Sequence, residues 1–101
     1  MMKTAEGIIT KSHSVAIVGL SLNLERASHW VASHLQSRGY RVIPVNPREK
    51  EVLGEWAYPD LISIPEKVDA VDIFRRSEDV PPIVDEAIEI GAKAVWMQER
   101  K

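Results

Sequence analysis

The chain has 101 residues, of which 45% are hydrophobic and 28% charged, with a formal net charge of −2 and no cysteine. This length and mixture fit one globular domain and exclude an intrinsically disordered chain. The small net charge excludes a general attraction to nucleic acid or to an anionic membrane, and the lack of cysteine excludes disulfides and thiolate metal sites. No apolar run approaches the roughly 20 residues that span a bilayer. We therefore expect a soluble cytoplasmic protein with neither nucleic acid nor membrane as a partner.

The first half of the chain predicts a strand followed by a helix. Residues 1–13 are expected to form a leader or a short helix, and residues 14–101 the folded domain. The run 14–18 is almost continuously apolar, which is typical of a strand covered on both faces of a parallel sheet. Residues 26–38 have the helical period. The predicted inward stripe of this helix consists of Ala27, Trp30, Val31, His34 and Leu35.

A second strand is predicted over residues 40–47, where the prolines favour an edge or an end. Residues 48–67 have the composition of a loop-rich connection. Within it we expect a very short strand near 56–58 and a helical turn near 60–62. The next apolar run, 68–74, predicts a further strand of the sheet.

The last part of the chain repeats the order of helix, glycine and strand. A helix is predicted over residues 77–90 and a final strand over 93–98, and Gly39 and Gly91 are expected to end the two helices. The predicted inward stripe of the second helix consists of Val80, Ile83, Val84, Ala87 and Ile88. Alternating strands and helices imply crossover connections, and so a small, doubly wound α/β domain with a parallel sheet.

Ligands of such folds bind at the carboxyl ends of the strands. In the first loop there, Gly19 allows a tight turn, while Ser21 and Asn23 can bond phosphate oxygens at the N-terminus of a helix. Ser28 and His29 follow in the first helical turn and could reach the same anion. Only one glycine of the dinucleotide-binding pattern G-x-G-x-x-G is present, so an ordinary strand-to-helix turn and a solvent-facing His29 stay open as alternatives.

The second and third loops add basic side chains. Asn46, Pro47 and Arg48 follow the second strand, where a nicotinamide dinucleotide site usually has an acidic residue. An arginine there suits a phosphorylated ribose, as in coenzyme A (CoA) or NADP, although a plain surface arginine is an alternative. The third loop consists of Phe74, Arg75, Arg76 and Ser77, which could stack on a base and neutralise phosphates. Its alternative is a core phenylalanine beside a charged turn.

Evidence for catalysis is weak. Asp69 and Asp72 are three residues apart in a predicted strand, so they are expected on opposite faces, at solvated strand ends, and not as a catalytic pair. The three histidines do not have the spacing of metal ligands, and the chain has no nucleophile elbow. We therefore predict no catalytic residue and no metal site.

Residues 14–98 resemble the small stand-alone CoA-binding proteins of the YccU-like type, which are similar to the N-terminal nucleotide-binding domain of the succinyl-CoA synthetase alpha subunit. The resemblance is carried by the segments VGLS, SHWVASHLQSRGYRVIPVNP, LGEWAYPDL, IPEKVDAVDIFRRSE and IVDEAIEIGAKAVWMQ. It implies a three-layer, Rossmann-like fold and non-catalytic, non-covalent binding of CoA or acyl-CoA. Two residues depart from the family pattern: Leu24 replaces a frequent proline, and Trp30 a smaller or polar residue.

The resemblance also implies roles for individual residues. The implied pyrophosphate loop is Gly19, Leu20 and Ser21, with Ser28 and His29 beside it. The residues implied at the adenosine 3′-phosphate are Asn46, Pro47 and Arg48. The residues implied on the adenine side are Phe74, Arg75, Arg76 and Ser77.

The end of the chain suggests a further expectation. Members of this family continue beyond the counterpart of Gln98 with one more helix and strand, which would leave the last strand here as an exposed edge. Such edges invite pairing, so a homo-oligomer is expected. Two other functions stay open: an NADP-type nucleotide-binding enzyme or sensor, and a self-associating interaction protein.

Overall fold

In the computed structural model, which describes residues 14–19, 27–75 and 77–97, four parallel strands form the central sheet. They are β1 (Ser14–Val18), β2 (Arg41–Val45), β5 (Ala70–Ile73) and β6 (Ala94–Met97), in the order β2-β1-β5-β6. The chain passes from β1 to one side of the sheet and then returns to the other side of β1. This order confirms the doubly wound parallel sheet predicted from the sequence.

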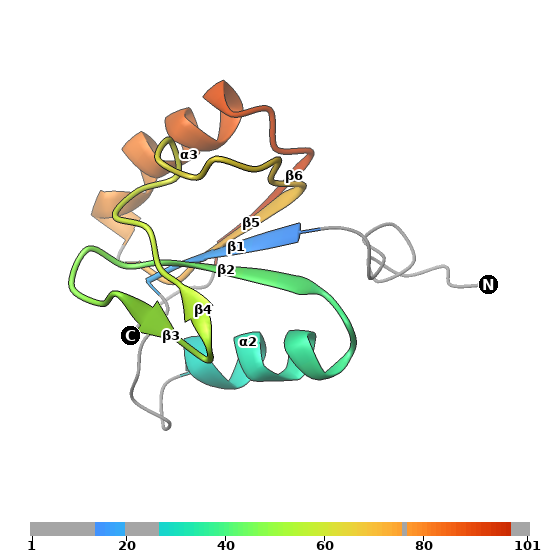
Figure 1. Cartoon of the computed structure of the whole chain (residues 1–101). Coiled ribbons are helices and arrows are strands. Elements are labelled where there is room, and N and C mark those ends of the chain that lie inside the picture. The colour runs from blue at the N-terminus through green and yellow to red at the C-terminus, as the bar shows by residue number, and fades with distance from the viewer. Residues whose placement is uncertain (1–13, 20–26, 76, 98–101) are drawn as a thin grey trace.

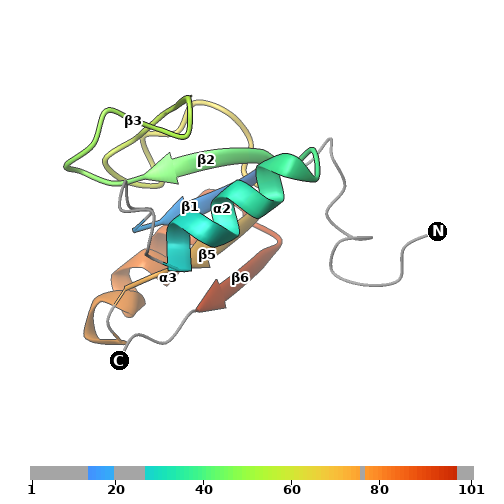
Figure 2. The same cartoon turned by 90° about the horizontal axis from the view of Figure 1, so that it is seen from below.

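Two helices cover the opposite faces of this sheet. The helix α2 (Ala27–Ser37) lies on one face and α3 (Val80–Glu89) on the other, and the views in Figures 1 and 2 show the same three layers. A short 3-10 helix, η1 (Ser77–Asp79), leads into α3. Neither helix in the described part of the chain combines the length and hydrophobicity that crossing a membrane requires.

Both predicted glycine ends are confirmed. Gly39 follows α2 with φ +92° and Gly91 follows α3 with φ +79°, a backbone conformation that glycine adopts without steric penalty. After α2, the N–H of Tyr40 donates to the carbonyl of Leu35, and after α3 the N–H of Ala92 donates to the carbonyl of Ala87. The chain can therefore turn sharply from each helix into the next strand.

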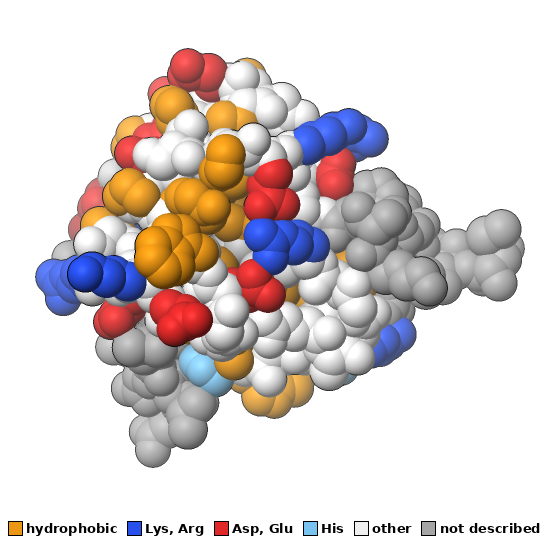
Figure 3. Space-filling view, viewed as in Figure 1, with side chains coloured by type: hydrophobic (Ala, Val, Ile, Leu, Met, Phe, Trp, Pro, Cys, Tyr) orange, Lys and Arg blue, Asp and Glu red, His pale blue; other side chains and the backbone are white. Residues whose placement is uncertain are grey.

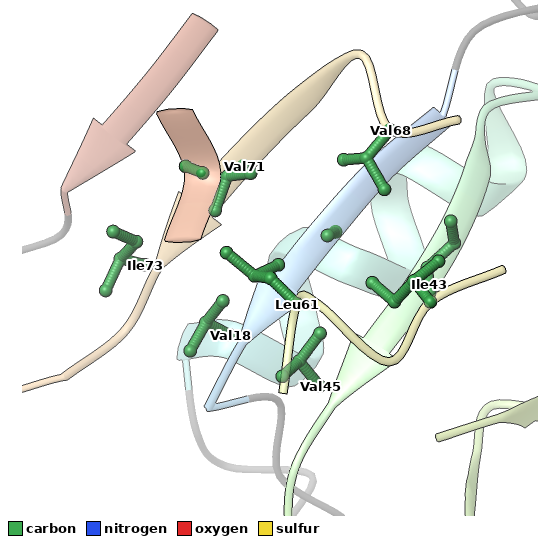
Figure 4. Packing of buried hydrophobic residues seen from close by; sticks show 10 residues of the cluster. Val18, Ile43, Val45, Leu61, Val68, Val71 and Ile73 are labelled. Atoms are coloured by element: carbon green, nitrogen blue, oxygen red, sulfur yellow. The ribbon is translucent and has the colours of Figure 1, made fainter. Parts of the chain in front are cut away.

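The sheet is apolar on both faces because each face packs against a helix. Every residue of β1 is buried, as its almost continuous apolar run predicts. The cluster on the α2 side contains Val15, Ile17, Ala32, Tyr40, Val42, Val52, Ala70 and Phe74. The cluster on the α3 side contains Ala16, Val18, Ile43, Val45, Leu61, Ile64, Val68, Val71, Ile73 and Ala87. Figure 4 shows how side chains of three strands and of the loop at Leu61 meet in the α3-side cluster.

The inward face of α2 differs from the predicted stripe. Trp30 is 66% exposed and its ring stacks on His34, with 5.5 Å between the ring centroids, on the outer side of the helix. The residues that turn to the sheet are Ser28, Val31, Ala32 and Leu35. Small side chains at 28 and 32 let the helix approach the strands closely, which a tryptophan would prevent. In α3 the predicted inward stripe is confirmed except for Ile88, which is 70% exposed.

The connection between β2 and β5 contains a small hairpin. Its strands are β3 (Glu51–Val52) and β4 (Glu55–Trp56), and both turn residues, Leu53 and Gly54, have positive φ. The side-chain amide of Gln36 donates to the carbonyl of Leu53 over 3.0 Å, which fixes the hairpin to α2. The very short strand expected near 56–58 is thus confirmed in its existence, although it begins at Glu55.

The same connection then runs along the outer edge of β2. Tyr58 forms an isolated parallel bridge with Val45, which covers the last part of that edge. The helical turn expected at 60–62 is not helical. In its place the carboxylate of Asp60 accepts bonds from the N–H and the hydroxyl of Ser63, at 2.8 and 2.7 Å, and this local bonding closes the turn.

An ion-pair network ties this connection to the first residue of β2. The guanidinium of Arg41 donates two bonds to the carboxylate of Glu66, at 3.1 and 2.7 Å, and a third to Glu55. Figure 3 shows acidic and basic side chains side by side across the middle of this face. The hydrogen bonds and charge of Arg41 hold the pKa of Glu66 below its ordinary value. The same pairing raises the pKa of Arg41, which therefore stays protonated.

The lowered pKa of Glu66 predicts an acid-sensitive contribution to stability. Because the folded state binds the proton less well than the unfolded state, the contribution is present above about pH 4.5 and is lost as the pH falls through the folded-state pKa. Both side chains are more than a third exposed, so solvent screening limits the contribution to less than about 1 kcal/mol. Urea unfolding of the wild type and of Glu66→Gln should differ at pH 7, and the difference should decrease as the pH falls below about 4.5. A difference that does not change with pH would exclude this explanation.

Candidate functional site

Three loops follow the carboxyl ends of neighbouring strands. Because β1 lies between β2 and β5, its end is flanked by both of theirs, on the left of Figure 1. The N–H of Gly19 donates to the carbonyl of Val45 over 2.9 Å, and the N–H of Phe74 donates to the carbonyl of Val18 over 2.8 Å. The predicted meeting of the three loops at one edge is therefore confirmed for their described residues. We call Gly19, residues 46–48 and residues 74–75 the carboxyl edge.

Gly19 is required by the contact between β1 and β5. Its φ is +88°, and a Cβ added there would lie 2.5 Å from the carbonyl oxygen of Phe74 and 3.4 Å from Nε of Arg75. Real Cβ atoms do not come as close to a main-chain oxygen as this. The predicted tight turn is present, and the backbone that approaches the glycine is that of the neighbouring strand.

The loop after β2 is held by its own asparagine. The side-chain oxygen of Asn46 accepts a bond from the N–H of Arg48 over 2.8 Å, and the N–H of Asn46 donates to the carbonyl of Tyr58 over 2.9 Å. The bond from Arg48 to the Asn46 side chain closes an Asx turn, and the bond to Tyr58 fixes the main chain of Asn46, so the backbone before the arginine is held. Pro47 and Arg48 are exposed, so the guanidinium is accessible at the carboxyl edge.

In the third loop, Phe74 and Arg75 have different environments. The ring of Phe74 is only 6% exposed and belongs to the α2-side cluster. The ring was expected to stack on a base, but it is buried in the core, where an aromatic side chain is stabilised by its removal from water. Arg75 is half-buried beside Gly19. Ser77 begins η1.

The start of α2 supplies two more predicted site residues. Ser28 is 4% exposed and His29 is half-buried, both within the first turn of the helix. The solvent-facing alternative for His29 is thus only partly met. The predicted residues Leu20, Ser21 and Arg76 lie outside the described residues, and their placement at the site stays a prediction.

Two aspartates that were expected at solvated strand ends are buried instead. Asp69 is 8% exposed and its carboxylate accepts the N–H of Ser14 over 3.0 Å, while Asp72 is 4% exposed on β5. The acceptor role of Asp69 compensates for its burial. The polar residue at the start of β1, Ser14, is the only sign of this pairing in the sequence. Within the described ranges, no group of three or more His, Asp or Glu side chains could hold a metal ion.

A doubly wound parallel sheet, with a glycine turn and basic side chains at its carboxyl edge, defines the Rossmann-like class of nucleotide-binding domains. The comparison with known families identifies one family within this class. The model of the CoA binding domain family matches residues 13–101, and the chain belongs to this family.

The relatives include small proteins. The chain is 41% identical over 92 residues to the uncharacterized protein YneT of Bacillus subtilis, a match that covers 91% of this chain and 68% of YneT. A hypothetical protein from Pyrococcus horikoshii OT3 has the same fold, with a TM-score of 0.79 and 43% identity. That match covers 81% of this chain and 58% of the Pyrococcus chain, so the chain spans less than two thirds of it.

Larger enzymes contain the same domain as one part. Acetate–CoA ligase [ADP-forming] I of Archaeoglobus fulgidus is 33% identical over 72 residues, which are 71% of this chain and 10% of the ligase. The dinucleotide-forming acetyl-coenzyme A synthetase 1 of Ca. Korarchaeum cryptofilum, solved in complex with phosphate and ADP, has a TM-score of 0.80 at 28% identity. The match covers 93% of this chain and 20% of the synthetase.

Proposed function

We propose that this chain binds CoA or acyl-CoA non-covalently at its carboxyl edge, without converting it chemically. The observation that carries the proposal is the position of Gly19. Its main chain bonds to the end of β2 and touches the end of β5, so all three loops of the edge lie next to one glycine turn. Family membership names the ligand that such an edge would hold.

The proposed binding uses main-chain amides and arginines. Residues 19–21 and the main chain of the first turn of α2, at Ser28 and His29, would lie near the diphosphate, because the N-terminus of a helix attracts anions. Asn46 and Pro47 would hold Arg48 toward the 3′-phosphate of the adenosine. A guanidinium matches phosphate oxygens with two parallel bonds. The third loop, residues 74–77, would complete the pocket.

The absence of catalysis is part of the proposal. Asp69, one of the two aspartates that are buried in the described part of the chain, bonds to the main chain of Ser14 at the amino end, away from the carboxyl edge. The small relatives contain the domain without the rest of a ligase, while the ligases contain it as a minor part of their length. The proposed location of such a binding protein is the cytoplasm, where CoA is available.

An NADP-type nucleotide is the second candidate ligand. Arg48 favours it, because an arginine after the second strand suits a phosphate on the ribose as well as it suits the 3′-phosphate of CoA. Calorimetric titration with CoA, dephospho-CoA and NADP separates the two candidates. CoA should bind most tightly. Tighter binding of NADP would replace the proposed function with a redox-cofactor function.

Removing the guanidinium of Arg48 should weaken the binding of CoA selectively. We expect Arg48→Ala to lower the affinity for CoA roughly tenfold or more, which corresponds to the loss of one charge-assisted hydrogen bond. Dephospho-CoA, which lacks the 3′-phosphate, should lose less than about twofold on the same scale. Calorimetry of both ligands measures the difference. Lys67→Ala is the control, because this exposed lysine precedes β5 at the opposite edge. Equal weakening of both ligands would contradict the role given to Arg48.

Self-association through β6 is a separate proposal. This strand pairs with β5 on one side, and its residues from Ala94 to Trp96 are only half-buried, while Met97 is 62% exposed. An apolar strand of this kind can pair with a second copy. Size-exclusion chromatography with light scattering should show a dimer in which Met97→Lys increases the monomer fraction. A wild type that is monomeric at high concentration would exclude this interface.

A further inference from the structure

The boundary between β1 and β5 is the switch point of the sheet. From β1 the chain crosses to β2 on one side, and after β2 it returns to β5 on the other. In open α/β sheets, ligands bind in the crevice outside this point. The first residues after the two strands, Gly19 and Phe74, are in contact there.

The side chain of Arg75 lies at this switch point. Its Nε is 3.4 Å from the position that a Cβ on Gly19 would occupy, so the guanidinium group lies beside Gly19. Arg75 follows Phe74, whose N–H is fixed to Val18. A half-buried arginine on a fixed backbone has few orientations to lose when a ligand binds.

The charges at the two edges of the sheet differ. At the amino edge, Arg41 pairs with two carboxylates. At the carboxyl edge, neither Arg48 nor Arg75 forms an ion pair with any residue that the structure describes. A half-buried guanidinium that has no carboxylate partner among the described residues favours an external anion, because an opposite charge and its hydrogen bonds compensate for desolvation.

We propose that Arg75 binds the diphosphate of the ligand, and that it does not line the adenine side as the family resemblance implies. This inference rests on the proposed function. Arg75 and Arg48 follow strands on either side of β1, and two strand spacings separate these strands by about 10 Å. The site would therefore require a nucleotide with a diphosphate and, at a distance, a second phosphate on the ribose.

Two variants and two ligands test the division between the arginines. Arg75→Gln should weaken CoA and dephospho-CoA by the same factor, roughly tenfold or more, because both ligands contain the diphosphate. Arg48→Ala should weaken only CoA. Arg75→Lys, which keeps the charge but not the two parallel bonds, should fall between wild type and Arg75→Gln. Calorimetry gives the affinities, and thermal melting verifies that each variant is folded.

A control variant and three possible results separate the failure of this inference from the failure of the proposed function. Lys67→Gln removes a positive charge at the amino edge and should leave both affinities unchanged. If the wild type binds both ligands and Arg75→Gln also binds both within twofold, the inference is overturned while the proposed function stands. Selective loss of CoA in Arg75→Gln would place Arg75 at the 3′-phosphate and also overturn it. A wild type that binds neither ligand overturns the proposed function, and the inference with it. If Arg75→Gln does not fold, the comparison of Arg75→Lys with the wild type decides.

Discussion

Gly19→Ala should destabilise the protein by about 3 kcal/mol or more, a large part of the 5–15 kcal/mol that a domain of this kind has. Two effects add. The φ of +88° costs about 1–3 kcal/mol for a residue with a Cβ. The new Cβ would also lie 2.5 Å from the carbonyl oxygen of Phe74, and the strands at this junction can separate only by losing their hydrogen bonds. Urea unfolding followed by circular dichroism measures the loss.

Gly54→Ala separates the two effects. Gly54 has a similar φ of +76°, but a Cβ added there would meet no atom within 4 Å. Its substitution should therefore cost only the backbone strain, about 1–3 kcal/mol. If Gly19→Ala and Gly54→Ala lose the same stability, the close contact with Phe74 does not limit residue 19. In a folded Gly19→Ala protein, the displacement of Arg75 should also weaken nucleotide binding.

The fold could be predicted because its signals are local and repeated. The almost continuous apolar run of β1 indicates burial on both faces, which in a parallel sheet is typical of a position between two layers of helix. Gly39 and Gly91 each end a helix directly before a strand, which gives the crossover connections and the parallel order. Once the order of the strands is given, the three loops must meet at one edge, because parallel strands end together.

The orientation of side chains could not be predicted in the same way. Trp30 is the largest apolar residue of α2 and was expected to face the sheet, yet it is exposed, and the small residues Ser28 and Ala32 are buried in its place. Phe74 is an aromatic residue beside two arginines, which suggested stacking on a base. Only the three-dimensional packing shows that its ring belongs to the core. Hydrophobicity along the chain gives the period of a helix, but close packing decides which residues fit.

Asp69 was expected at a solvated strand end because it is charged, but it is buried. Its substitution is the second change for which we expect a large loss of stability. Its carboxylate accepts the N–H of Ser14, the first residue of β1, while its main-chain N–H donates to the carbonyl of Ser14 over 3.1 Å. Its own carbonyl accepts the N–H of Lys93, just before β6, over 2.8 Å. One residue thus joins the amino ends of three strands of the sheet.

Asp69→Ala is expected to destabilise the protein by about 2–3 kcal/mol, because it leaves the buried N–H of Ser14 without an acceptor. Asp69→Asn keeps an oxygen at nearly the same position and should lose about 1 kcal/mol, the difference between a charged and a neutral acceptor. Urea unfolding at pH 7 measures both variants. Backbone amide exchange should show the largest loss of protection at the start of β1, since this is where the acceptor is removed.

Asp60→Ala provides the matched control. The carboxylate of Asp60 also accepts a main-chain N–H, that of Ser63, but it does so in an exposed turn where water can replace it. Its removal should therefore cost about 1 kcal/mol or less. If Asp69→Ala is no more harmful than Asp60→Ala, the bond to Ser14 does not hold the sheet together, and the burial of Asp69 must be compensated elsewhere. If Asp69→Asn is as harmful as Asp69→Ala, the negative charge itself is required, because both substitutions remove it and only one removes the acceptor.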